Sequence, residues 1–110
     1  MNDYETTERV LKALGETTRL RIVHYLVHDA FCICELVTLL EMSQPSVSQH
    51  MKRLKDVGLV EEERRGKWMY YSLATDHPLY PLVLHIVQTL PSTKGTIDAF
   101  VQDGKRLLCE

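Results

Sequence analysis

Two cysteines separated by one residue, Cys32 and Cys34, have the most specific chemistry in this chain of 110 residues. Thiolates are soft ligands that select thiophilic ions over Mg²⁺ or Ca²⁺, and a helix N-terminus makes a thiol more acidic and more reactive. Two cysteines can also be buried simply as small apolar side chains. The pair directly precedes a segment with the pattern of a DNA-binding helix pair, which favours ion binding or redox sensing over inert burial.

The third cysteine, Cys109, is next to last in the chain. An odd number of cysteines, and an acidic N-terminus without a basic region and apolar run, indicate a reducing cytoplasm rather than secretion. No apolar stretch is long enough to span a membrane, so we expect no membrane partner. The length predicts one domain over residues 1–110, and the 45% apolar and 25% charged fractions are typical of a soluble globular protein.

A second group of candidate residues follows a predicted tight turn at residues 41–43. Its Gln, Ser and His side chains can hydrogen-bond to base edges in the major groove, and its Lys and Arg side chains suit phosphates. The whole chain has a net charge of −2, but residues 44–73 hold six basic against four acidic side chains. A solvated amphipathic helix and a charged turn are the alternative interpretation. The residues expected to contact DNA are Gln44, Ser46, Ser48, Gln49, His50, Lys52, Arg53, Arg64, Arg65 and Lys67.

The spacing of apolar residues predicts the elements that hold these side chains. Helices are expected over residues 6–14, 17–28, 34–40, 44–57, 78–90 and 93–108, and strands over residues 59–64 and 67–73. Thr17 or Thr18 is expected to cap the second helix and Ser43 the fourth, which Gly58 can end in a left-handed conformation. Four helices, a β-hairpin and two more helices predict a mainly α, winged helix-turn-helix fold whose hairpin tip is basic.

The one-residue spacing of the cysteines suggests how an ion would act. Residues i and i+2 of a helix face different directions, so Cys32 and Cys34 cannot hold one ion while both are helical. We therefore expect ion capture to distort the start of the third helix and, through the turn at residues 41–43, the fourth helix. A ligand that binds the distorted form better must weaken DNA binding by the same coupling free energy.

Five motifs occur in order along the chain: KALGETTRLRI at residues 12–22, CICEL at 32–36, SQPSVSQHMKRL at 43–54, GLV at 58–60 and RGKW at 65–68. Through them the stretch from Leu11 to Leu73 resembles the ArsR/SmtB family of metal-responsive winged-helix repressors, and most nearly the arsenic-responsive ones. The resemblance implies a homodimer, with the first and last helices at its interface. It also implies binding to a palindromic operator in double-stranded DNA and release by an inducer.

The resemblance further limits the inducer. Arsenic-responsive members often carry a third cysteine three residues after the second, where this chain has Val37. Cadmium- and lead-type members add a cysteine from the N-terminal arm, and residues 1–31 contain none. The resemblance therefore implies trivalent arsenic or antimony as the inducer at Cys32 and Cys34, without an organic cofactor. Cys109, a small thiol or no third ligand remain open.

Other interpretations use the same residues differently. A thiol-redox or persulfide-sensing repressor would use Cys32 or Cys34 with Cys109. A small thiol oxidoreductase or metal carrier would show no sequence-specific DNA binding. His24 and His28 have the i,i+4 spacing of metal ligands, but an arginine shares their stripe, which favours a solvated face. The sequence shows no set of nucleophile, base and orienting group, so we do not expect an enzyme.

Overall fold

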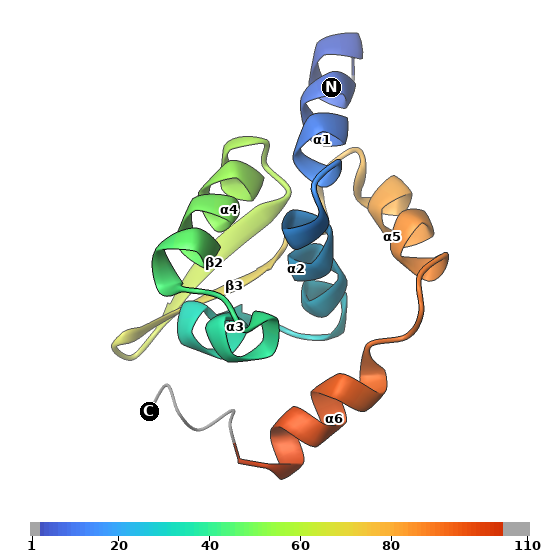
Figure 1. Ribbon diagram of the computed structural model, residues 1–110. Helices are drawn as coiled ribbons and strands as arrows, with labels where there is room; N and C mark the ends of the chain where they lie inside the picture. The colour runs from blue at the N-terminus through green and yellow to red at the C-terminus, as the bar shows by residue number, and fades with distance from the viewer. Residues whose placement is uncertain (1–2, 105–110) are drawn as a thin grey trace.

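The computed structural model describes residues 3–104. Helices and a small sheet follow one another in the order of a winged helix-turn-helix fold (Figure 1), which confirms the fold class expected from the sequence. The elements are α1 (Tyr4–Leu14), α2 (Thr17–His28), β1 (Phe31–Cys32), α3 (Ile33–Leu40), α4 (Gln44–Asp56), β2 (Val60–Arg65), β3 (Trp68–Leu73), α5 (Tyr80–Gln88) and α6 (Lys94–Gln102). None of the helices in this part of the chain is long and apolar enough to cross a membrane.

The sheet has three antiparallel strands in the order β1-β3-β2. Strands β2 and β3 form the expected hairpin, called the wing below, and Gly66 takes a φ of 63° at its tip, a conformation that favours glycine. The sequence did not predict β1. It pairs with β3 through Phe31 opposite Tyr71 and Cys32 opposite Tyr70. The first cysteine is therefore part of the sheet that carries the wing.

The helix-turn-helix is formed by α3 and α4. Helix α4 buries Val47, Met51 and Leu54, the apolar stripe expected from their spacing. Ser43 is its N-cap and accepts a hydrogen bond from the backbone N–H of Ser46 at 3.3 Å. The C-cap of α3, Glu41, has a left-handed φ of 55°, which gives the chain its tight turn between the two helices.

The start of α2 differs from the expectation that Thr17 or Thr18 caps it. Glu16 is the N-cap, and its carboxylate accepts a hydrogen bond from the backbone N–H of Arg19 at 2.9 Å. A carboxylate placed one residue earlier satisfies the same open N–H group and also carries a negative charge to the positive end of the helix. The cap therefore joins Glu16 and Arg19 at the junction between α1 and α2.

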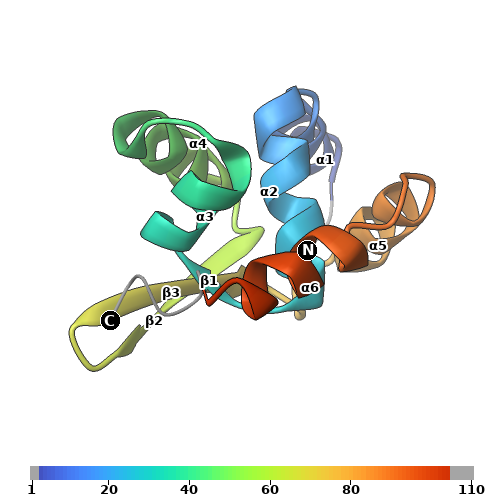
Figure 2. The same ribbon diagram turned by 60° about the horizontal axis from the view of Figure 1, so that its bottom comes forward.

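Helix α6 covers the outer side of β1. Figure 2 shows α6 beside β1 and one end of α2. Its Ile97 and Phe100 are buried, and the Phe100 ring meets the Phe31 ring edge-on, with 6.4 Å between centroids. Residues 105–108, expected to continue this helix, and Cys109 lie outside the described residues. The last described helix thus packs directly behind the strand that contains Cys32.

Candidate DNA-binding surface and cysteine site

The cysteine pair, Cys32 and Cys34, lies where β1 turns into α3. Their Sγ atoms are 3.3 Å apart. Cys32 is extended, with φ −88° and ψ 167°, and forms the N-cap of α3, whereas Cys34 is the second residue of the helix. Cys32 is buried and Cys34 is half-buried, so the pair is reached from the Cys34 side.

This geometry corrects the expectation that the pair can converge only by distorting a helix. The divergence of residues i and i+2 applies only when both are helical. Because Cys32 stands outside the helix in strand β1, the backbone bend between Cys32 and Cys34 brings the two sulfurs together. Unwinding of α3 is therefore not needed for both sulfurs to contact one atom.

The cysteine pair is tied to its surroundings through the backbone. The N–H of Cys32 donates to the buried Oε1 of Glu35 at 2.9 Å, and Thr38 Oγ1 donates to the carbonyl of Cys34 at 3.3 Å. On its other side Cys32 pairs with Tyr70 of the wing strand β3. The pair thus joins the first helix of the helix-turn-helix to the wing. Within residues 3–104 no cluster of three or more His, Cys, Asp or Glu side chains is arranged to hold a metal ion.

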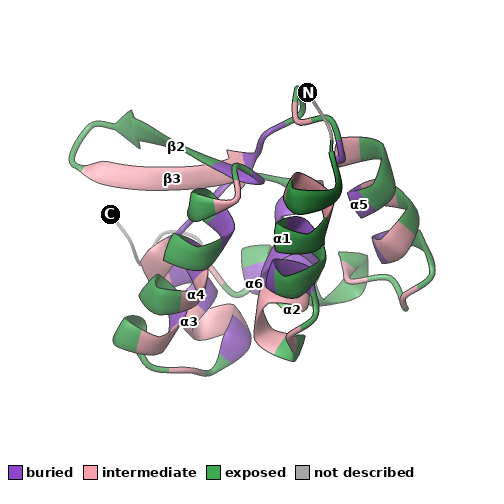
Figure 3. Cartoon of the chain, turned by 90° about the horizontal axis from the view of Figure 1, so that it is seen from above, coloured by how far each residue is buried: buried purple, intermediate pink, exposed green. Residues whose placement is uncertain are grey.

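The candidate DNA-binding residues lie along α4 and the wing, whose tip is on the side of the molecule away from α1 and α5 (Figure 1). In Figure 3 the outer side of α4 and most of β2 are exposed, whereas β3 is only partly exposed. Ser46 is half-buried, and its hydroxyl accepts a hydrogen bond from the Ser43 hydroxyl at 3.0 Å. The candidate residues that are exposed are Gln44, Ser48, Gln49, Lys52, Arg53, Arg64, Arg65 and Lys67.

The basic side chains of the wing differ in their partners. Arg65 Nε is 2.7 Å from the Glu63 carboxylate, and its guanidinium lies 4.6 Å from the centre of the Tyr70 ring. The hydrogen bond to Glu63 raises the pKa of Arg65 above its ordinary value. Among the described residues, Arg64 and Lys67 have no carboxylate partner. These two are therefore the wing cations most available to phosphates.

The basic residues of α4 are similarly divided. Lys55 is 2.9 Å from the carboxylate of Glu62 on β2, and this hydrogen bond raises the pKa of Lys55. Lys52 is 4.0 Å from Asp56, one turn along the exposed side of the helix. Arg53 has no carboxylate partner in the part of the chain that the structure describes. The Lys55–Glu62 contact also fixes the wing to the end of α4.

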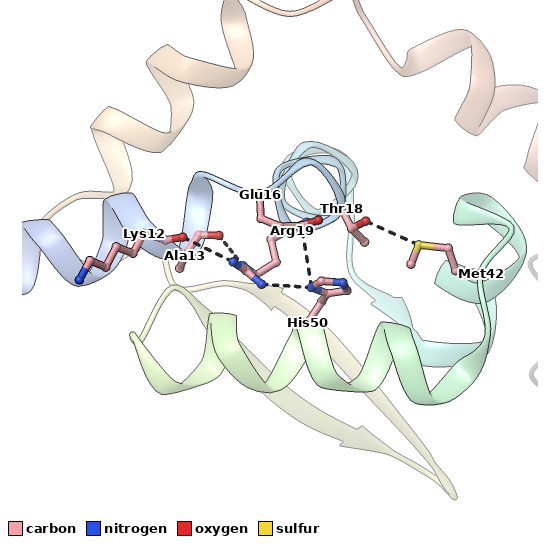
Figure 4. Close-up of polar contacts among 7 residues, drawn as sticks. All are labelled: Lys12, Ala13, Glu16, Thr18, Arg19, Met42 and His50. Carbon is pink, nitrogen blue, oxygen red and sulfur yellow. Dashed lines mark hydrogen bonds and ion pairs between the residues drawn. The ribbon is translucent and has the colours of Figure 1, made fainter.

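His50 is not among the exposed residues of α4. Its ring faces the junction of α1 and α2, where Nδ1 lies 3.2 Å from Nη1 of Arg19 and 3.5 Å from Oε2 of Glu16 (Figure 4). A ring held in this way is turned toward the protein body and not toward the exposed side of α4, where the sequence placed it. Val47 and Leu54, three residues before and four after it, already put His50 at the edge of the buried stripe.

Comparison with known proteins agrees with this geometry. Residues 16–62 match the model of the bacterial regulatory proteins of the arsR family. The chain is 34% identical over 100 residues to the arsenic resistance transcriptional regulator ArsR1 of Pseudomonas putida, covering 90% of this chain and 72% of that protein. The chain belongs to the ArsR family. It is also 34% identical over 70 residues to a cadmium resistance regulator, the CadC homolog of Staphylococcus aureus, covering 63% and 58% of the two chains.

A solved structure supports the same assignment. The homodimeric winged helix-turn-helix DNA-binding domain Mb0332 of Mycobacterium bovis superposes with a TM-score of 0.68 at 29% identity and covers 77% of each chain. ArsR-family proteins with this fold are DNA-binding transcription regulators. The chain is accordingly a transcriptional repressor of the metal-responsive type.

The structure also corrects the interpretation of the two histidines on α2. His28 is exposed, but His24 is buried with 9% of its surface accessible, so the pair does not form a solvated face. Burial, helped by the charge of nearby His28, lowers the pKa of His24. The rings lie 6.2 Å apart beside a cavity of about 260 Å³ that Val87 and Ser92 help to line. A helix that packs on both sides buries residues that a single apolar stripe would leave exposed.

Two residues that organise the site were not found from the sequence, namely Arg19 and Glu16. Both contact His50, which is more than 30 residues away along the chain. Nothing in the local pattern around Arg19 indicates a partner at that distance. The position of His50 at the edge of the buried stripe was the one available sign that it contacts the protein body.

Proposed function

We propose that this repressor binds a palindromic operator as a homodimer and is released when trivalent arsenic or antimony binds Cys32 and Cys34. The observation that carries the proposal is the 3.3 Å separation of the two sulfurs at the start of the helix-turn-helix. A soft ion bonds to thiolate sulfur at about 2.3 Å, so two sulfurs at this separation can contact the same ion. The half-buried Cys34 supplies the route of entry.

The third ligand is proposed to be Cys109 or a small thiol. Helix α6 packs against β1 through Phe100 and Phe31, and Gly104 is the last described residue after it. Cys109 follows Gly104 by five residues, and a chain of that length can reach at most about 3.3–3.6 Å per residue from Gly104. Three cysteines cannot supply the four thiolates of a closed Cd²⁺ or Zn²⁺ site within one chain. Taken with the resemblance to the arsenic-responsive members, this count supports a trivalent ion as the inducer.

The coupling to DNA is proposed to run through the strand that contains Cys32. Cys32 pairs with Tyr70 of the wing, and its N–H bonds to Glu35 in the first turn of α3. An ion held by Cys32, Cys34 and a third ligand would move Cys32 and so act on both contacts at once. If the ion binds the shifted arrangement better than the DNA-bound one, operator affinity must fall by the same factor.

The DNA interface is proposed to comprise the exposed side of α4 and the tip of the wing. Ser48 and Gln49 offer hydrogen-bonding groups suited to base edges. Arg53, Arg64 and Lys67 lack carboxylate partners within the described residues and suit phosphates. We propose that the protein acts in the cytoplasm, together with its operator DNA.

The resemblance implied an interface of the first and last helices. Because the last described helix, α6, packs on β1 through Phe100 and Phe31, the homodimer is proposed to form through α1 and α5 instead, with residues 1–110 acting as one domain. Both helices lie on the side of the molecule away from the wing tip (Figure 1). They carry three of the exposed large apolar side chains: Tyr4 is 97%, Leu11 50% and Leu82 36% exposed. Large exposed apolar side chains are a feature of interaction surfaces. Two subunits would also supply the two half-site contacts that give a short recognition helix its specificity.

The decisive experiment is operator release by arsenite. The purified protein is bound to a labelled duplex selected from a random-sequence library, and arsenite, antimonite, cadmium, zinc and a persulfide are titrated in parallel. We expect release by arsenite and antimonite at the lowest concentrations, and loss of release in Cys32→Ser and Cys34→Ser. Unchanged release in either variant would rule out the pair as the inducer site. Cys109→Ser separates a three-cysteine site from a two-cysteine site.

A thiol-redox sensor on the same fold is the second candidate, because the sulfurs already lie close together. Oxidation would join two cysteine sulfurs with loss of two protons and two electrons to an oxidant such as a persulfide or peroxide. Mass spectrometry after mild oxidation distinguishes the candidates. A specific cross-link that abolishes DNA binding, with no release by arsenite, would replace the metalloid proposal.

A further inference from the structure

The side chain of Arg19 connects three helices. From the first turn of α2, its Nε donates to the carbonyl of Ala13 at 2.6 Å and its Nη2 to that of Lys12 at 3.5 Å, both at the C-terminal end of α1. Its Nη1 lies 3.2 Å from Nδ1 of His50, in the middle of α4 (Figure 4). The carbonyls at a helix end have no partner within the helix. Arg19 therefore caps α1 and holds α4 with the same guanidinium.

The chemistry of this contact fixes which group donates. Arginine has only donors, so in a hydrogen bond between these two side chains Nδ1 of His50 is the acceptor. Glu16 Oε2 also lies 3.5 Å from Nδ1 and is itself held by the N–H of Arg19. Burial raises the pKa of Glu16, but hydrogen bonds from the backbone N–H groups of Arg19 and Thr18, with the nearby positive charges, bring it below its ordinary value. The carboxylate is thus ionised beside the Arg19–His50 contact.

The contact bears on how α4 is rotated about its own axis, together with the buried stripe of Val47, Met51 and Leu54. His50 follows Ser48 and Gln49 directly, and its ring points to the protein body while those two side chains are exposed. Residues of a helix keep fixed angles to one another, so anchoring His50 also fixes the direction of Gln49. A second contact, Thr18 Oγ1 to the sulfur of Met42 at 3.7 Å, holds the turn before α4 against the same end of α2.

We propose that Arg19 and His50 are positioning residues for operator recognition, which set the rotation of α4 without contacting DNA themselves. The inference rests on the proposed use of α4 to contact base edges. It deepens that proposal by separating the residue that is held, His50, from the residues that contact bases. Losing the contact frees α4 to rotate, which weakens base contacts more than contacts to the uniform phosphate backbone.

The test compares affinity for two duplexes, the one the parent protein enriches most from a random library and a scrambled duplex of the same length. His50→Asn keeps an acceptor oxygen close to the position of Nδ1, whereas His50→Leu removes the acceptor. We expect His50→Leu to lower affinity for the selected duplex by about tenfold, with little change for the scrambled one. His50→Asn should bind both nearly as the parent does. Equal behaviour of the two variants would overturn the proposal.

Arg19→Gln completes a double-mutant cycle with His50→Leu. If the two residues act through one contact, the double variant should lose no more selectivity than either single variant, and additive losses would contradict a shared role. Arg19→Gln also removes the cap of α1, so its thermal unfolding is measured to separate a loss of stability from a loss of selectivity. The His50 variants leave that cap in place. Gln49→Ala tests the underlying function. If it leaves selectivity unchanged, Gln49 does not contact bases and the proposed use of α4 fails at this residue. If it removes selectivity while His50→Leu does not, only the positioning role fails.

Discussion

The two unpaired cations of the wing should contribute more to DNA binding than the paired one. Arg64 and Lys67 have no carboxylate partner among the described residues, whereas Arg65 is 2.7 Å from Glu63. A cation that is already neutralised releases fewer counterions from DNA when it binds, because it must first exchange its own partner. Arg64→Ala and Lys67→Ala should therefore reduce the salt dependence of operator binding, and Arg65→Ala should do so less.

The expected change in salt dependence is set by the number of wings in the DNA-bound dimer. Each phosphate contact contributes about 0.9 to the slope of log affinity against log salt concentration. A homodimer has two wings, so Arg64→Ala or Lys67→Ala should flatten the slope by about 1.8. Between about 50 and about 200 mM salt, the ratio of parent to variant affinity should then shrink roughly tenfold. Glu63→Gln frees Arg65 and should steepen the slope.

The assay is fluorescence anisotropy of a labelled operator duplex at four or more salt concentrations. Lys94→Ala, which removes an exposed cation from α6 on another part of the molecule, is the matched control and should leave the slope unchanged. Slopes for Arg64→Ala and Lys67→Ala that equal the parent's would remove the wing tip from the DNA interface. A larger effect for Arg65→Ala than for both would refute the argument from pairing.

Three further predictions concern stability. Because the pKa of His24 is lowered in the folded protein, the unfolded chain binds a proton at a higher pH than the folded chain does. The free energy of unfolding should therefore fall as the pH drops through about 6.5. His24→Gln should weaken this fall, as measured by urea titrations at several pH values. Phe100→Ala removes the edge-on contact with Phe31 and should cost about 3 kcal/mol of unfolding free energy by thermal or urea unfolding. Glu41→Gly removes the strain of a left-handed backbone at a residue with a side chain, and should raise the free energy of unfolding by about 0.5 kcal/mol. A lower free energy of unfolding would show that the Glu41 side chain itself stabilises the fold.

The sequence predicted those parts of the fold that depend on local pattern. The spacing of Val47, Met51 and Leu54, with Ser43 ahead of them, placed α4 correctly because burial and capping are determined within a few residues. Strand β1 was missed because it is two residues long and exists only through its pairing with β3, about 40 residues later. No periodicity can be detected in two residues.

The same limit applies to the candidate site. Cys32 and Cys34 were recognised from their type and spacing, but their convergence depends on a strand-to-helix boundary that falls between them. The orientation of His50 depends on Arg19, which reaches it from another helix. Residue type predicted which side chains have suitable chemistry, whereas their direction was determined by contacts between segments distant in the sequence.

The central claim is that the cysteine pair and the operator are thermodynamically coupled, and it is tested most directly by measuring arsenite affinity with and without operator DNA. Coupling is reciprocal, so the factor by which arsenite weakens operator binding must equal the factor by which the operator weakens arsenite binding. We expect equal factors for the parent and no measurable coupling for Cys34→Ser. Arsenite affinity that is the same for free and operator-bound protein would contradict the account.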